Sequence, residues 1–414
     1  MASVSIPLGT TDYLTQVYSY PNDPDSSESL SDTILHWFNQ TLERDGFKAE
    51  GATATVTADG DRLTLVVNGP DAIHEYGTRL PEFLQNGFKA LQIIEELKTE
   101  TKVWPKGLTI LTEDKLWDPQ NTGKWRFFLP FGMAMINQTT LNFFHYPPMR
   151  LLDQMRDYLK DPVPDRLIQM LKICGLQTEQ EAWLYSTVMD CAPIAAPDNQ
   201  GTQSIGKYGE PGAQSVHLIP IDRFHEYQRS QVQILLNTSS QNENFTVPIV
   251  VFGTPATRTF NALYKDQLGG QTLRDNQALV ADGIIEGKKT AVIAAGHPYR
   301  FYMAAQGEAG TGRLLPGKNC VRAVHTMKED LATIGWQIAM AKDPSQDPVA
   351  VYNDSRSHWD APEQAATVCQ LVQYQASLWY PDPKSLEFTW KLSMDEAASL
   401  CANSGNDPCA AAGS

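Results

Sequence analysis

The sequence predicts an α/β protein: a three-layer αβα core with a mainly parallel central sheet, plus an N-terminal α+β module. Four apolar strand candidates support the core, at residues 125–131, 183–190, 247–252 and 290–295. Amphipathic helices are expected between them, around residues 148–174 and 222–237. Strands that alternate with helices are typical of a parallel sheet covered on both faces. Before residue 110 the order is instead helix, hairpin, helix.

The N-terminal module is predicted over residues 1–110. An acidic, Pro/Ser-rich loop at 20–32 leads to a helix that starts at Ser31 or Asp32 and stops at Gly46. Two segments of period-two alternation flank Asp59-Gly60-Asp61, which is a strong hairpin signal. A second helix is expected over 81–98, and Trp-Pro-Lys-Gly at 104–107 marks a boundary.

The rest of the chain divides into an α/β core at 111–345 and a C-terminal helical extension with a flexible tail at 346–414. Three helices are expected towards the C-terminus, around residues 325–342, 361–378 and 393–401.

Composition restricts the function classes. The 414 residues are 42% hydrophobic and 20% charged, which is enough to bury a core, and the net charge of −15 disfavours a general nucleic-acid coat or a binder of anionic membranes. We find no apolar run of ~18 residues and no basic segment followed by an apolar stretch at the start. A cytoplasmic protein without a membrane segment is therefore expected; the oligomeric state is left open.

The six cysteines suggest no cofactor. They are Cys174, Cys191, Cys320, Cys369, Cys401 and Cys409. No CxxC pair occurs, so neither a zinc site nor an iron–sulfur cluster is expected. We interpret them as buried or incidental thiols. A bridge between Cys401 and Cys409 in the polar tail is compatible with the sequence but not required by it.

Ligands of parallel sheets bind at the carboxyl ends of the strands, so the residues after each strand are the candidates for function. His297 follows the strand at 290–295 and precedes Tyr299, Arg300 and Phe301. Between Lys288 and Lys328, seven Lys/Arg stand against one acid, a local balance of +6. Cations beside aromatic rings suit a phosphate backbone and unstacked bases. The alternative is a solvated helix face with a structural histidine.

Two other strand exits carry polar groups. Thr254 and Arg258 open a helix after 247–252, where a phosphate could bind or a threonine could merely cap the helix. Asp190 ends the strand at 183–190, as a general base or a turn cap. The segment 312–318 has the spacing of a phosphate-binding P-loop, but Asn319 replaces the Ser/Thr that would bind magnesium, and we discount it.

Several of these exits resemble the uracil-DNA glycosylase superfamily. VVFGTPATRTFNAL and AVIAAGHPYR are similar to its third and last strand motifs, and LYSTVMDCAP to a segment of its iron–sulfur members. Pro-Phe-Gly-Met-Ala at 130–134 resembles the first motif of the single-strand-selective members. The resemblance covers about residues 120–345.

The resemblance implies a DNA glycosylase that flips a nucleotide out of the stack and hydrolyses its N-glycosidic bond, leaving an abasic site. His297 would stabilise charge on the departing base, and Asn137 or Asp190 would position water or stabilise the sugar cation. The implied base-binding residues are Phe131, Met133, Phe143 and Phe144. The implied DNA-binding residues are Thr254, Arg258, Tyr299, Arg300, Phe301, Lys318 and Arg322.

Departures from the family pattern suggest an altered substrate. Tyr299 replaces the usual Ser after His-Pro, and the first motif offers only Asn137 if the loop shifts. We therefore expect uracil or, more readily, a modified base, such as a hypermodified base of phage DNA in antiviral defence. Two alternatives stay open: a catalytically silent nucleic-acid-binding protein on the same fold, and an unrelated α/β enzyme acting on nucleotides.

Overall fold

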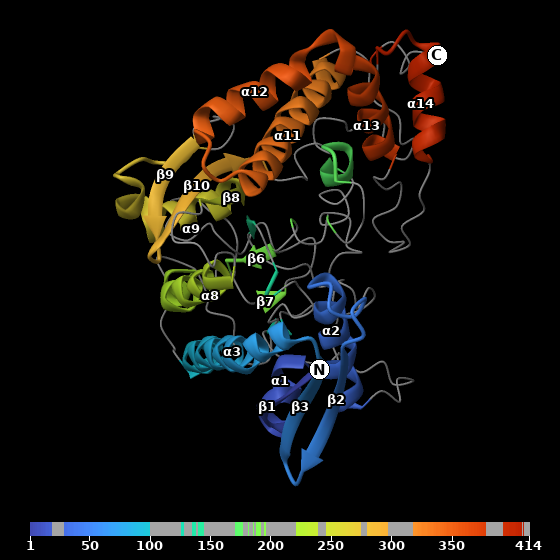
Figure 1. The fold of residues 1–414 in the computed structure, drawn as a ribbon. Helices are drawn as coiled ribbons and strands as arrows, with labels where there is room; N and C mark the ends of the chain where they lie inside the picture. Colours follow the sequence, from blue (N-terminus) through green and yellow to red (C-terminus); the bar gives the residue numbers. More distant parts are fainter. Residues whose placement is uncertain are drawn as a thin grey trace.

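The computed structural model describes most of both sheets and of the C-terminal helices. The described residues are 1–18, 29–99, 126–127, 135–137, 140–144, 170–176, 181, 185, 188–191, 194–195, 221–238, 246–274, 280–296, 318–377, 392–407 and 409. The N-terminal sheet and the C-terminal helices lie at opposite ends of the molecule, with the larger sheet between them (Figure 1).

The N-terminal module is a three-stranded antiparallel sheet with helices. Its elements are β1 (Ala2–Thr10), α1 (Thr11–Tyr18), α2 (Leu30–Arg44), β2 (Thr53–Asp59), β3 (Arg62–Gly69), the 3-10 helix η1 (Asp71–Glu75) and α3 (Tyr76–Thr99). The sheet order is β1-β3-β2, so the predicted hairpin is confirmed. The sequence reading missed β1, whose pairing shifts between Pro7 and Gly9.

Helix α2 begins earlier than predicted. Ser29 caps it: its hydroxyl accepts from the Asp32 N–H, and the Asp32 carboxylate accepts from the Ser29 N–H in return. This reciprocal capping box satisfies two N–H groups that a helix start otherwise leaves open. The predicted start at Ser31 or Asp32 was therefore one or two residues too late, because the choice fell on the later of several possible caps.

The central sheet has five strands in the order β6-β5-β8-β10-β9. Its strands are β5 (Leu141–Phe144), β6 (Val188–Asp190), β8 (Val247–Phe252), β9 (Val280–Ile285) and β10 (Lys288–Ala295). β6, β5, β8 and β10 run parallel, which confirms the mainly parallel sheet; β9 is an antiparallel edge strand. β5 and β9 were not predicted.

The strand expected at 125–131 does not join this sheet within the described residues. β4 (Arg126–Phe127) instead pairs antiparallel with β7 (Ile194–Ala195) in a separate two-stranded sheet. Among the described residues, the first strand of the central sheet is therefore β5, and residues 135–137 do not follow a described strand of that sheet.

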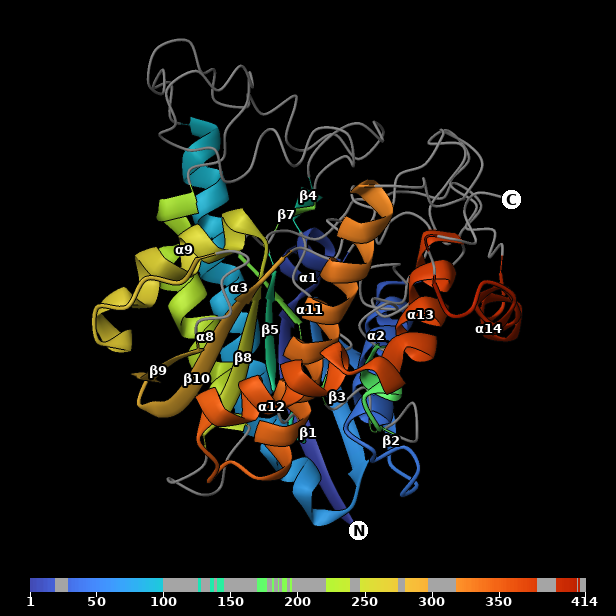
Figure 2. The same cartoon turned by 90° about the horizontal axis from the view of Figure 1, so that it is seen from above.

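Helices cover both faces of the central sheet. Alternate strand residues such as Phe143 and Val251 pack with α8 (His225–Thr238), which the 3-10 helix η4 (Ile221–Phe224) precedes, and with α9 (Thr254–Tyr264). The intervening residues, such as Phe252, pack with α11 (Lys318–Lys342) in a buried cluster that also contains the N-terminal module. Figure 2 shows α8 and α9 on one side of the sheet and α11 on the other.

The remaining elements complete the C-terminal region. The 3-10 helix η5 (Lys265–Leu268) follows α9, and α12 (Pro348–Asp360), η6 (Pro362–Gln364), α13 (Ala365–Ser377) and α14 (Met394–Asn403) follow α11. The helices expected at 325–342 and 393–401 are confirmed as α11 and α14, and that at 361–378 matches α13; α12 was missed. In the described part of the chain, no helix is long and apolar enough to span a membrane.

Two disulfides contradict the reading of the cysteines as thiols. Cys320 in α11 pairs with Cys409, and Cys369 in α13 pairs with Cys401 in α14, with Cα–Cα distances of 5.5 and 5.9 Å. Cys174 and Cys191 are free. The bridge considered between Cys401 and Cys409 does not form, because each pairs with a helix far earlier in the chain.

Candidate functional site at the carboxyl edge of the parallel sheet

Four strand ends lie side by side at the carboxyl edge of the central sheet. Phe144 pairs with Asp190 on one side, and its ring stacks on Phe252 of β8 with centroids 4.6 Å apart. Phe252 in turn pairs with Ala295 of β10. The Gly253 N–H donates to the Ala295 oxygen at 2.9 Å, so the two exits remain adjacent one residue beyond the strands.

The strand order identifies where along this edge a ligand would bind. β5 comes first among the parallel strands in the chain, β6 lies on one side of it, and β8 and β10 lie on the other. The order therefore reverses at β5. In open α/β sheets a crevice forms outside the carboxyl ends at such a reversal, because the chain leaves in opposite directions there.

Asp190 lies on this edge in a buried position. It is 4% exposed, at the last residue of β6. Burial raises the pKa of the neighbouring Cys191 thiol, and the charge of Asp190 raises it further. Tyr227 of α8 responds in the same way: burial raises the pKa of its phenol, and Asp190 adds to the shift. Both shifts show that the Asp190 carboxylate lies close to Cys191 and Tyr227, and a buried carboxylate at a strand end is a candidate general base.

The peptide after Asp190 is fixed by helix α8. The Gln228 side-chain amide donates to the Cys191 oxygen, and the Cys191 N–H donates to the Phe144 oxygen at 2.9 Å. Gln228 is fully buried. The carboxylate of Asp190 is therefore presented by a rigid backbone.

Helix α9 starts at the same edge and could hold an anion. Gly253 caps it at φ +86°, and the Thr257 hydroxyl donates back to the Gly253 oxygen at 3.0 Å. Thr254 and Arg258 are exposed, one helical turn apart, so both side chains lie on one side of the helix start. The backbone N–H groups of a helix start favour a phosphate there. The prediction that Thr254 and Arg258 both contact DNA is thus compatible with this geometry.

Most of the segment that follows β10 lies outside the described residues. Four predicted site residues of that segment, His297, Tyr299, Arg300 and Phe301, are outside them. Two predicted base-binding residues before β5, Phe131 and Met133, also lie outside the described residues. In the chain, His297 follows Gly296, which itself follows the last residue of β10. Lys318 is the first residue of α11, and Arg322 is exposed one turn further along that helix.

The structure places the two predicted stacking residues of β5 in the core. Phe143 is fully buried, and its ring meets that of Phe260 of α9 edge to face, with centroids 5.2 Å apart. Phe144 is 5% exposed and stacks on Phe252. Both rings are buried by packing within the core, because residues 141–144 form a strand and not a loop. They are therefore not exposed for stacking on a base.

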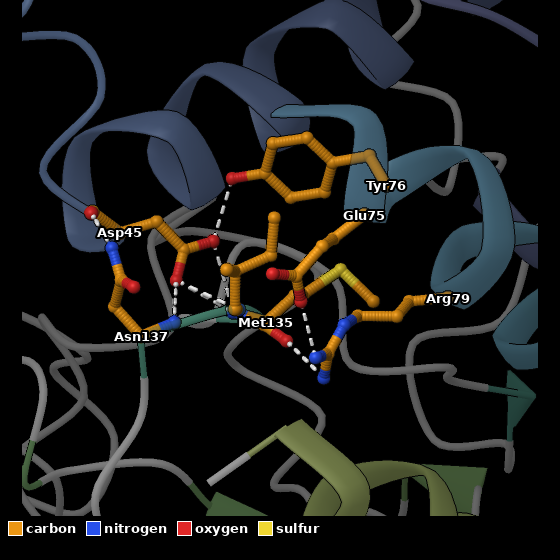
Figure 3. A network of polar contacts seen from close by, with 7 residues as sticks. Asp45, Glu75, Tyr76, Arg79, Met135 and Asn137 are labelled. Atoms are coloured by element: carbon orange, nitrogen blue, oxygen red, sulfur yellow. Dashed lines mark hydrogen bonds and ion pairs between the residues drawn. The ribbon is translucent and has the colours of Figure 1, made fainter. Parts of the chain in front are cut away.

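Asn137 lies in a polar network with the N-terminal module (Figure 3). Its side-chain amide donates to the Asp45 backbone oxygen at 2.6 Å, and its N–H donates to the Asp45 carboxylate at 2.9 Å. Asn137 precedes β5, whereas Asp190 ends the parallel strand β6. The two residues therefore lie toward opposite ends of the sheet, and the structure does not bring Asn137 to the carboxyl edge.

Asp45 is the residue that organises this network, and the sequence reading missed it. Its carboxylate accepts from the N–H groups of Met135, Ile136 and Asn137 at 2.9–3.0 Å and from the Tyr76 hydroxyl at 2.6 Å. Burial raises the pKa of Asp45, and the donated hydrogen bonds only partly oppose this. In sequence, Asp45-Gly46 reads only as the end of a helix.

Arg79 completes the network from α3. Its guanidinium donates to the Met135 oxygen at 3.5 Å and pairs with Glu75 (Figure 3). The N-terminal module thus holds residues 135–137 through their three backbone N–H groups and through the Met135 oxygen. A role for this module follows: it fixes the chain that enters β5.

The basic stretch from Lys288 to Lys328 does not form one face in its described parts. Lys288 and Lys289 open β10, so at about 3.3 Å per residue they lie about 20 Å from its carboxyl end. The Lys328 ammonium lies 3.5 Å from the Asp360 carboxylate of α12. The local balance of +6 therefore overstated the positive charge available at the candidate site.

Comparisons with family models, curated proteins and solved structures found no match for this chain. Among the described residues, no group of three or more His, Cys, Asp or Glu side chains could bind a metal ion.

Proposed function

We propose that the chain is a DNA glycosylase that flips out a nucleotide and hydrolyses its N-glycosidic bond, with uracil or a modified base as the substrate. The observation that carries the proposal is the shared carboxyl edge, where buried Asp190 and the start of α9 lie beside the strand that leads to His297. A phosphate at α9 and a base near β5 would place the sugar between them.

In this proposal Asp190 positions the attacking water or stabilises the sugar cation. Its burial supports that role, since a carboxylate in a low-dielectric setting interacts strongly with a developing positive charge. His297 would stabilise the departing base. Asn137 keeps no part in the reaction, because its amide is engaged by Asp45.

The test is formation of abasic sites. The purified chain is incubated with oligonucleotides that contain uracil or modified bases, and abasic sites are detected by alkaline cleavage. We expect cleavage at one class of base, lost in Asp190→Asn and in His297→Ala while their circular dichroism stays unchanged. Retention of wild-type activity in both variants would contradict the assignment.

A second candidate is a catalytically silent nucleic-acid-binding protein on the same fold. The engagement of Asn137 by Asp45 favours it, because Asn137 was the polar candidate of the first motif and does not lie at the carboxyl edge. DNA retained in a mobility-shift assay without any abasic product would support this candidate. Failure to bind DNA at low salt would favour an α/β enzyme acting on free nucleotides.

The disulfides bear on localisation. Stable disulfides are rare in a reducing cytoplasm and common in oxidising compartments. The two disulfides therefore favour an oxidising compartment over the expected cytoplasmic location. The redox state of the cysteines in the native source tests this inference.

A further inference from the structure

The C-terminal strap, defined as residues 392–409, is joined to α11 and α13 by two disulfides, and its described residues bury little apolar surface. Within the strap, α14 buries only Ala397 and Cys401, and Leu400 is 40% exposed. Tyr374 of α13 and Ala397 form a small buried cluster with Met394 against it, and Met394 and Cys409 also pack against the main cluster that contains α11. The side chain of Gln370 adds one hydrogen bond, to the Met394 oxygen at 2.9 Å.

The helices that anchor the strap belong to the main core. Cys320 of α11 is fully buried there, and Val368, Leu371 and Val372 of α13 lie in the same cluster. Among the described residues, the anchors thus contribute many buried apolar side chains to the main core, whereas the strap contributes only the partly buried Met394 and Cys409 to it. A ten-residue helix such as α14 is marginal in water without such packing, even with the capping box that Ser393 and Glu396 form.

We propose that the two disulfides make the C-terminal strap a redox-sensitive element that is locked to α11 and α13 when oxidised and released when reduced. A dithiol reductant donates two electrons and two protons to each bridge. The S–S bond breaks to give two cysteine thiols, and the reductant closes into its own disulfide. The released strap uncovers Tyr374 and the α13 surface beneath Ala397, while the sheets stay folded.

The experiment uses the full chain purified under oxidising conditions. Thiol titration in denaturant should find two of the six cysteines free, and all six after treatment with dithiothreitol. Hydrogen–deuterium exchange is then compared in both states. We expect exchange in 394–403 to rise at least ~10-fold on reduction while β8 and β10 keep their protection, as for local opening.

Variants separate the two bridges. Cys409→Ser breaks the bridge to α11, and Cys401→Ser breaks the bridge to α13; each should raise exchange in α14 without reductant. Cys174→Ser removes a free cysteine and should behave as wild type. Six free thiols in the oxidised protein, unchanged exchange in 394–403 after reduction, or equal loss of protection in β8 and β10 would each overturn the proposal.

Discussion

At the scale of single residues, Asp45 carries the most concentrated set of interactions. Its two carboxylate oxygens satisfy three backbone N–H groups and the Tyr76 hydroxyl, all buried or partly buried. A buried donor left without its acceptor costs ~1–3 kcal/mol. We expect Asp45→Ala to lower the free energy of unfolding by about 3 kcal/mol or more, measured by urea denaturation. Asp45→Asn should cost less, because it keeps one acceptor oxygen.

The control for this series is Glu82→Ala, which removes an exposed carboxylate from α3. Surface changes of this kind stay within about 0.5 kcal/mol. If Asp45→Ala is no more destabilising than Glu82→Ala, then Asp45 does not hold residues 135–137 as described.

The raised pKa of Asp282 predicts that the stability of the fold depends on pH. Asp282 is exposed on β9, but the groups around it partly desolvate its carboxyl, which raises its pKa above the ordinary value; the charge of Asp347 raises it further, and Lys289 opposes both. A carboxyl whose folded pKa is raised favours the folded state only while protonated, so its contribution is lost as the pH rises through that pKa. At neutral pH the charged form therefore destabilises the fold.

Asp282→Asn should accordingly raise the melting temperature at pH 7, and the gain should vanish near pH 3, where the wild-type carboxyl is protonated. Thermal unfolding by circular dichroism at both pH values measures this. Asp266→Asn, at an exposed position in η5, is the matched control. An equal gain in melting temperature at both pH values would show that the charge of Asp282 does not cause the effect.

At the scale of elements, the turn from β8 into α9 depends on glycine. Gly253 has φ +86° and ψ 158°, a backbone conformation that a side chain strains by ~1–3 kcal/mol. We expect Gly253→Ala to lower the free energy of unfolding by an amount in that range. Lys265→Ala, at the exposed far end of α9, should change it by less than about 0.5 kcal/mol. Equal effects would show that the turn tolerates a side chain.

The elements also show what sequence could predict. β8 and β10 were found because continuous Val, Ile and Ala runs are typical of strands buried on both faces. β9 was missed because Asp282 and Gly283 interrupt its pattern, and β5 because its four residues are few and its phenylalanines suggested stacking. The disulfides were missed because sequence separations of 89 and 32 residues give no local signal.

The candidate site was predicted in part for the same physical reason. The positions of Asp190 and of the start of α9 at strand ends were predicted correctly, because strand exits follow apolar runs that are easy to recognise; their roles stay a prediction. Asn137 was misplaced because residues 125–131 were read as a strand of the sheet. Only the long-range partner Asp45, 92 positions away, reveals what Asn137 does.

At the scale of the whole molecule, charge decides where DNA could bind. The net charge is −15, so an anionic backbone is repelled except where cations gather locally. The carboxyl edge has the exposed Arg258 on α9, with Lys288 and Lys289 far away at the other end of β10. DNA bound at the carboxyl edge would therefore contact Arg258, whereas DNA bound at the other end of β10 would contact Lys288 and Lys289.

This difference gives a test of the DNA-binding face. If DNA binds at the carboxyl edge, Arg258→Ala should weaken binding of every sequence alike and reduce the slope of log K against log salt by about 1, as expected for one lost phosphate contact. The double variant Lys288→Ala/Lys289→Ala should leave both quantities unchanged. Fluorescence anisotropy at several salt concentrations measures them. The opposite result would move the DNA to the amino edge of the sheet, away from Asp190 and α9, and would separate binding from the proposed chemistry.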